Sequence, residues 1–155
     1  MSRRLQDEIK QTRPFATLEQ EAYLSLGRTW AVLEHAFAEV LKPYGITPTQ
    51  YNVLRILRGA GEKGLCRSEV IERMIARVPD ATRLLDRMEA AGLIARARSS
   101  EDRRFVTTRI IEEGLVLLEE LDEPVLELHR RQFSALGEDH LHTLVELLCR
   151  ARPSE

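Results

Sequence analysis

The sequence predicts a mostly α-helical fold with one small β-hairpin, and three observations lead to that prediction. Apolar residues recur every three or four positions along most of the chain, which is the spacing of one face of an α-helix. Between residues 93 and 110 the pattern changes to two short strands around a polar turn. Helical patterns then return and continue nearly to the end of the chain. A helix followed directly by a hairpin, inside a helical frame, is typical of a winged helix-turn-helix.

The N-terminal part predicts one long helix. Residues 1–16 form a polar extension that we expect to be helical in part and broken near Pro14. From Leu18 to Leu41 the apolar positions step by threes and fours, which indicates an amphipathic helix that ends at the turn around Gly45. Its apolar stripe consists of Tyr23, Leu26, Trp30, Leu33, Phe37 and Val40.

Two shorter helices are marked by their first residues. Thr47 and Gln50 have the spacing of a capping box, with Pro48 at the first helical position, and the helix they open runs to Gly59. After a loop with three glycines, Cys66 begins the first helix of the helix-turn-helix. We expect the inner face of that helix to consist of Val70, Ile71, Met74 and Ile75.

The candidate recognition helix begins at Pro79, whose fixed φ suits a first helical turn, and can end in a left-handed cap at Gly92. Its inward residues would be Ala81, Leu84, Leu85 and Met88. Strands are expected over residues 93–98 and 104–110, with an arginine-rich tip that suits the minor groove. The candidate DNA-binding residues are Arg77, Asp80, Thr82, Arg83, Asp86, Arg87, Arg103 and Arg104.

Two more helices should follow the hairpin, from Glu112 to about Phe133 and from Glu138 to Ala151. Ile111 stands where a helix needs a capping side chain and cannot accept the free amide hydrogen bonds. Pro124 removes a backbone hydrogen bond inside the first of these helices, which predicts a kink or a break near Asp122.

The order and spacing of these segments resemble the MarR family of transcriptional regulators over nearly the whole chain. The resemblance rests on the run Thr82–Glu89, on Gly92-Leu93-Ile94, on Asp102-Arg103-Arg104 and on Glu113-Gly114. It implies a homodimer that binds pseudo-palindromic double-stranded DNA, usually as a repressor released by a small molecule or by oxidation. We therefore expect one domain over residues 1–155, with a DNA-binding lobe at 47–110 and dimerisation helices at 1–42 and 112–155.

Composition agrees with this interpretation. A length of 155 residues fits one domain. The net charge is −2, but ten arginines and seven acidic residues lie between Arg67 and Arg109, so positive charge gathers where DNA would bind. No apolar run approaches the roughly 18 residues that span a bilayer, and the first residues do not form a signal peptide. We expect a cytoplasmic protein without a membrane partner.

The resemblance also implies a pocket for small aromatic or phenolic acids between the dimerisation helices and the DNA-binding lobe. Aromatic and imidazole rings can stack on such a ligand or hydrogen-bond its substituents. The candidate ligand-binding residues are Tyr23, Trp30, His35, Phe37 and Tyr51.

Alternatives to a ligand-released repressor start from the cysteines. Cys66, at a helix N-terminus beside Arg67, is a candidate reactive thiolate and would make the protein a redox sensor. The peroxide-sensing members of the family, however, carry their reactive cysteine near the N-terminus, where this chain has none, and Cys149 suits an apolar filler. A second alternative is a helical protein-interaction module, which would not need an arginine-tipped wing.

Neither a metal site nor an enzyme is expected. His140 and His142 lie about 200° apart on a helix and cannot chelate one ion from one face, and His35 and His129 stand alone. The sequence has no phosphate-binding loop, nucleophile elbow or paired metal ligands, so it predicts no cofactor and no catalytic residues.

Overall fold

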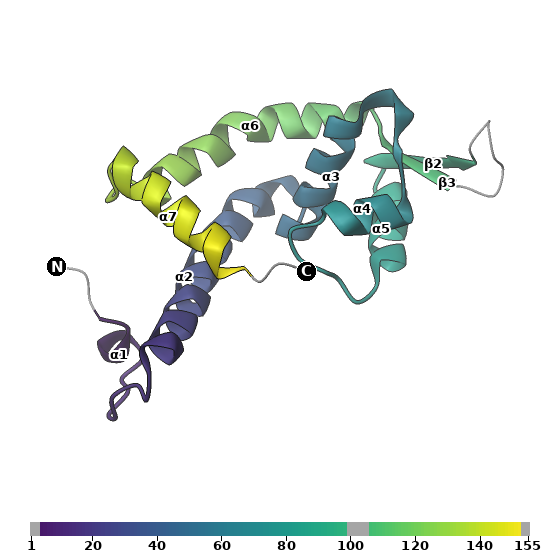
Figure 1. The fold of residues 1–155 in the computed structure, drawn as a ribbon. Helices are drawn as coiled ribbons and strands as arrows, with labels where there is room; N and C mark the ends of the chain where they lie inside the picture. The colour runs from purple at the N-terminus through teal and green to yellow at the C-terminus, as the bar shows by residue number, and fades with distance from the viewer. Residues whose placement is uncertain (1–3, 99–105, 153–155) are drawn as a thin grey trace.

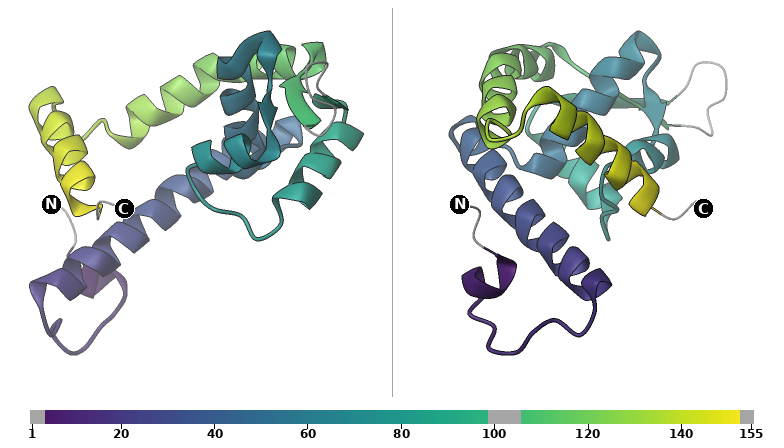
Figure 2. Two further views of the ribbon diagram at one scale, coloured as in Figure 1. Left: turned by 45° about the vertical axis from the view of Figure 1, so that its right-hand side comes forward. Right: turned by 60° about the vertical axis from the view of Figure 1, so that its left-hand side comes forward.

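The computed structural model describes residues 4–98 and 106–152, and it confirms a mostly helical fold with a small sheet (Figure 1). Two long helices lie against each other and carry a lobe of shorter helices and strands at one end, while the first and last helices lie at the other end (Figure 2). The helices of the described residues are α1 (Leu5–Glu8), α2 (Leu18–Leu41), α3 (Pro48–Ala60), α4 (Arg67–Arg73), α5 (Ala81–Ala90), α6 (Glu112–Gln132) and α7 (Glu138–Ala151), with 3-10 turns at Lys42–Tyr44 and Gly61–Lys63.

The described part of the chain contains one antiparallel sheet of three strands in the order β1-β3-β2. β2 (Ile94–Arg98) pairs with β3 (Val106–Ile110) in the predicted hairpin, with Ile94 opposite Ile110. β1 (Leu65–Cys66) adds to the other edge of β3 and was not predicted, because two residues are too few to show an alternating pattern. The predicted hairpin tip with Arg103 and Arg104 lies outside the described residues.

The core centres on α3, which packs against α2 and α6 on one side and against β3 and α4 on the other. The fully buried side chains come from all of these elements: Leu41, Val53, Leu54, Leu57, Val70, Leu85, Met88, Ile94, Thr108, Leu118 and Leu121. The long helices and the lobe therefore share one hydrophobic core around α3.

Helix starts largely follow the predictions. The Thr47 hydroxyl accepts the Gln50 amide at 3.2 Å and the Gln50 side chain accepts the Thr47 amide at 2.9 Å, so the predicted capping box is confirmed. α5 begins at Ala81 rather than at Pro79, because Asp80 caps it. α4 ends at Arg73, and the backbone is extended at Met74. The prediction that Ile75 belongs to its inner face is therefore wrong, since Ile75 is 79% exposed.

α6 runs without interruption through Pro124, as one bowed ribbon (Figure 1). Of the kink or break predicted near Asp122, the break is therefore wrong. Leu121 and Val125, on either side of the proline, are both buried in the core, and their packing holds the helix together where one backbone hydrogen bond is missing. At its start, Ile111 gives no side-chain cap, as predicted, and its own amide donates to the Leu93 carbonyl at 3.3 Å.

Large apolar surfaces stay uncovered at the end away from the lobe. Tyr23, Leu26 and Trp30 of the predicted α2 stripe are 78%, 55% and 53% exposed. α7 has no buried residue, although one of its faces is apolar. In Figure 2 this helix stands apart from the lobe. None of the described helices is long and apolar enough to cross a membrane.

Candidate nucleic-acid interface and ligand cavity

α5 presents a polar face whose position is set by its N-cap and its buried side. The Asp80 carboxylate accepts the Arg83 amide at 2.9 Å, which fixes the first turn. Gly92, at φ 71°, closes the other end in the predicted left-handed cap, with the Leu93 amide donating to the Met88 carbonyl at 3.1 Å. The predicted inward residues are buried and the predicted outward ones exposed.

Like Asp80, the predicted DNA-binding residues Thr82 and Asp86 have partners inside the protein. Arg67, the first residue of α4, donates to the Thr82 hydroxyl at 2.8 Å and so ties the two helices of the helix-turn-helix together. The Asp86 carboxylate pairs at 2.6 Å with Arg96 of β2. The sequence analysis predicted neither pairing, because nothing in the local sequence marks which arginine pairs across elements.

Arg96 is the main link between the hairpin and α5. Its guanidinium donates to one oxygen of Glu89 at 2.6 and 2.9 Å, and its backbone amide donates to the other oxygen at 2.9 Å. These hydrogen bonds lower the pKa of Glu89 and raise that of Arg96 above its ordinary value. The ion pair therefore fixes the base of the hairpin against the helix.

The remaining cations point outward. Arg83 and Arg87 are exposed on α5, and their guanidinium groups make no hydrogen bond or ion pair with another residue that the structure describes. Arg77 is exposed in the linker between α4 and α5. The arrangement combines a rigid helix, two exposed guanidinium groups and an adjacent two-stranded ribbon, which suits a DNA groove and its phosphates.

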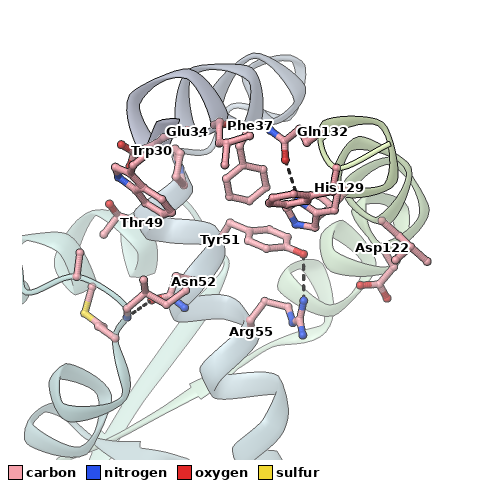
Figure 3. Close-up of a pocket in the computed structure, with 18 of the residues that line it drawn as sticks. Trp30, Glu34, Phe37, Thr49, Tyr51, Asn52, Arg55, Asp122, His129 and Gln132 are labelled. Carbon is pink, nitrogen blue, oxygen red and sulfur yellow. Dashed lines mark hydrogen bonds between the residues drawn. The ribbon is translucent and has the colours of Figure 1, made fainter. Parts of the chain in front are cut away.

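A cavity of about 670 Å³ lies between α2, α3, α6 and the linker after α4 (Figure 3). Of the five predicted ligand residues, Trp30, Phe37 and Tyr51 line it. Tyr23 and His35 are exposed on α2 and are not among the lining residues. Phe37 and Tyr51 meet edge to face with ring centroids 5.2 Å apart, and Phe37 also lies 5.9 Å from the ring of His129. The cavity thus has an aromatic wall.

Of two arginines of α3 at the cavity, Arg58 is paired with a carboxylate and Arg55 is not. Arg58 forms a bidentate pair with Asp122 at 2.8 and 2.9 Å. These hydrogen bonds lower the pKa of Asp122, so the pair stabilises the fold above the ordinary pKa of an aspartate and ceases to do so as the pH falls through the lowered value. Arg55 is exposed at the cavity and donates to the Tyr51 hydroxyl at 3.3 Å, and no carboxylate of the described residues pairs with its guanidinium. Arg55 is therefore the cation available to an anionic ligand.

The cavity wall includes the linker that leads to α5. Met74, Ile75 and Ala76 line the cavity together with Asn52 of α3. The Asn52 side-chain oxygen accepts the Ile75 backbone amide at 3.0 Å, which is how the linker is fixed to α3. This contact could not be predicted from the sequence, because Asn52 lies inside a helical pattern and is not next to a cap or turn.

Other chemical sites are few in the described part of the chain. No three His, Cys, Asp or Glu side chains gather there in a way that could hold a metal ion. Cys66 is half-buried at the start of α4, with its amide donating to Glu69 at 2.7 Å, and Cys149 is exposed on α7. His142 lies 3.8 Å from Glu138 on the same helix.

Comparisons with known proteins agree with this geometry. A family model described as the MarR family matches residues 44–104. The chain is 38% identical to a MarR transcription factor from Planctomyces limnophilus, over 89% of this chain and all of that one, with a TM-score of 0.67. It is 34% identical to the HTH-type transcriptional repressor IacR of Pseudomonas putida, over 70% of this chain and 64% of IacR.

A third relative shares the fold at lower identity. BpsR of Bordetella bronchiseptica is 22% identical with a TM-score of 0.80, over 92% of this chain and all of that one, and is described as regulated in its DNA binding by 6-hydroxynicotinic acid. The similar proteins are named as transcription factors and regulators and not as enzymes, in agreement with the sequence.

Proposed function

The chain belongs to the MarR family of DNA-binding transcriptional regulators, and on this basis we propose that it is a homodimeric repressor of a pseudo-palindromic operator, released by a small aromatic or phenolic acid. The observation that carries the proposal is the position of the cavity, whose wall includes the segment leading directly into the recognition helix α5. The names of two relatives support it, since IacR is called a repressor and BpsR is regulated by a hydroxylated aromatic acid.

The proposed DNA contacts follow from the exposed face of α5. Arg83 and Arg87 are free to form bidentate hydrogen bonds to guanine edges in the major groove. Thr82, held by Arg67, lies on the same face, and Arg77, Arg103 and Arg104 would contact the phosphates or the minor groove. Asp80 and Asp86, both predicted to face DNA, are proposed to act indirectly, by capping the helix and holding the hairpin.

Arg83→Ala should weaken binding to the preferred operator by roughly 1 to 3 kcal/mol and reduce discrimination among sequences, because a base contact is lost. Titration of a fluorescent operator duplex, compared with a scrambled one at fixed salt, measures both effects. Arg130→Ala is the matched control, since Arg130 is an exposed arginine of α6 that pairs only locally, with Glu123 and Glu127. If the Arg83→Ala protein binds both duplexes as tightly as the unmodified protein does, this face of α5 does not bind DNA.

The proposed repressor is a dimer because its apolar surfaces at one end have nothing to pack against in a single chain. The exposed apolar residues of α2 and the apolar face of α7 contribute to this surface. A second copy related by two-fold symmetry would cover the same residues on both chains and set two copies of α5 against two half-sites.

Ligand release is proposed to act through the hydrogen bond from Ile75 to Asn52. A ligand seated on the aromatic wall would lie beside Ile75 and Ala76, and displacing them would break this hydrogen bond. Asp80, only five residues after Ile75, caps α5, so a shift of the linker changes where the recognition helix begins. The ligand would thereby stabilise a lobe position that no longer fits both half-sites.

In the absence of ligand, Asn52→Ala should therefore lower operator affinity by about threefold to tenfold. This factor corresponds to the free energy of one hydrogen bond, the one that orders the linker. It should also shrink the further loss of affinity that 6-hydroxynicotinate causes, while calorimetry still shows the ligand binding. Asn52→Asp, which keeps an acceptor oxygen, is the matched control and should resemble the unmodified protein. If Asn52→Ala responds to the ligand as fully as the unmodified protein, the linker is not the route of release.

A further inference from the structure

His129 of α6 is held by a chain of two hydrogen bonds that ends at a backbone carbonyl. The Gln132 side-chain nitrogen donates to the Leu33 carbonyl of α2 at 3.0 Å. The other atom of that amide, the oxygen Oε1, lies 3.2 Å from Nδ1 of His129. Because a carbonyl oxygen can only accept a hydrogen bond, the side-chain nitrogen of Gln132 must face Leu33 and its oxygen must face His129.

The orientation of the amide decides where the ring proton of His129 resides. Oε1 of Gln132 has no hydrogen, so the hydrogen bond at 3.2 Å requires a proton on Nδ1. In the uncharged ring the second nitrogen, Nε2, is then unprotonated and is a hydrogen-bond acceptor. Nε2 makes no hydrogen bond with another residue that the structure describes.

This acceptor belongs to the cavity. His129 is a lining residue, its ring contacts Phe37, and in Figure 3 the side of the ring away from Gln132 is turned toward Tyr51 and Arg55. The cavity therefore offers an aromatic wall, one cation at Arg55 and one acceptor at His129.

We infer that His129, held in its Nδ1-protonated form by Gln132 and Leu33, selects effectors that carry a hydrogen-bond donor on an aromatic acid. The inference rests on the ligand cavity of the proposed function and adds its specificity-determining residue. The carboxylate of such a ligand pairs with Arg55, its ring packs on Phe37 and Tyr51, and its hydroxyl donates to Nε2 of His129. A ligand of the same size without the donor leaves that nitrogen without a partner when water is displaced.

The position of the ring proton can be measured without any ligand. In protein labelled with nitrogen-15 in histidine, at a pH of about 8.5 where histidine rings are uncharged, the chemical shifts of His129 should show Nδ1 protonated. Free imidazole side chains favour the opposite form, which His140 of the exposed α7 should show as an internal reference. His129→Phe identifies the signals. A His129 ring protonated at Nε2 would overturn the inference while leaving the proposed function standing.

Ligand selection is tested with three probe classes: the hydroxybenzoates, the methoxybenzoates and benzoate. In the unmodified protein, calorimetry should show at least one hydroxybenzoate binding roughly threefold to tenfold more tightly than benzoate and than its methoxy counterpart, which cannot donate. His129→Phe should keep benzoate binding and lose the preference. Gln132→Leu should reduce the preference, whereas Gln132→Glu, which still accepts from Nδ1, should retain it.

The outcomes separate the two proposals. Equal affinity for the three classes in the unmodified protein, or an unchanged preference in His129→Phe, overturns the role of His129 and leaves the cavity as a ligand site. No binding of any probe, with operator binding intact, removes the aromatic-acid cavity from the proposed function and the inference with it.

Discussion

Val145→Asp should convert the protein into a monomer and lower its affinity for a two-fold symmetric operator by about 100-fold or more. Val145 is 60% exposed and its neighbour Leu147 54% exposed on α7, which buries no residue in the single chain. A carboxylate at this position costs little in a monomer. At a dimer interface it would be a buried, unpaired charge, which destabilises the dimer by several kcal/mol. Light scattering at micromolar concentration and operator titration together measure the change.

The matched control for this prediction is Glu146→Gln, which changes an exposed polar side chain on the same helix. Circular dichroism establishes that both proteins keep their helices, so that loss of the dimer is not confused with loss of the fold. A Val145→Asp protein that remains dimeric and binds the palindrome normally would show that α7 is not part of the interface.

Gly114→Ala should destabilise the protein by roughly 1 to 3 kcal/mol or more, because a methyl group has no room there. A Cβ at this position would lie 2.4 Å from the Leu93 carbonyl oxygen and 2.8 Å from Cγ1 of Ile110. The carbonyl cannot retreat, since it also accepts the Ile111 amide where α6 begins. The close approach joins the end of α5, the hairpin and α6, so the strain would fall on the region that positions the DNA-binding face.

Urea titration of the Gly114→Ala protein gives the change in the free energy of unfolding. Gly59→Ala is the matched control, because Gly59 lies in α3 with no atom within 4 Å of its would-be Cβ, and alanine there should stabilise by roughly 0.5 to 1 kcal/mol. Equal stability of the Gly114→Ala and unmodified proteins would mean that the contact between α6 and the end of α5 is not tight.

Features of this fold that depend on residues close together in the sequence could be predicted from the sequence. The Thr47 and Gln50 capping box and the left-handed Gly92 depend on residues within a few positions of each other, and both were predicted. The end of α4, the strand β1 and the continuity of α6 through Pro124 depend on tertiary packing, and they were missed. Such features are decided by which elements lie beside a segment rather than by the segment itself.

The cavity shows the same division. The family resemblance implied a ligand pocket, and Phe37 and Tyr51, named as candidates because their rings could stack on a ligand, do line the cavity. The sequence offered no means of choosing between His35 and His129 as lining residues, because the choice depends on how α6 lies across α2. Which of Arg55 and Arg58 is paired with a carboxylate depends on the position of Asp122 on another helix, and the sequence does not show that position.

We propose above all that this chain is a dimer whose two copies of α5 bind a symmetric DNA sequence. Selection of binding sites from a pool of random duplexes, with the mass of the selected complex measured afterwards, tests it most directly. We expect enrichment of an inverted repeat, bound by two copies of the chain, whose half-sites are centred about one helical turn apart, roughly 10 base pairs, or a multiple of that. An unenriched pool, or a site without two-fold symmetry bound by a single chain, would contradict it.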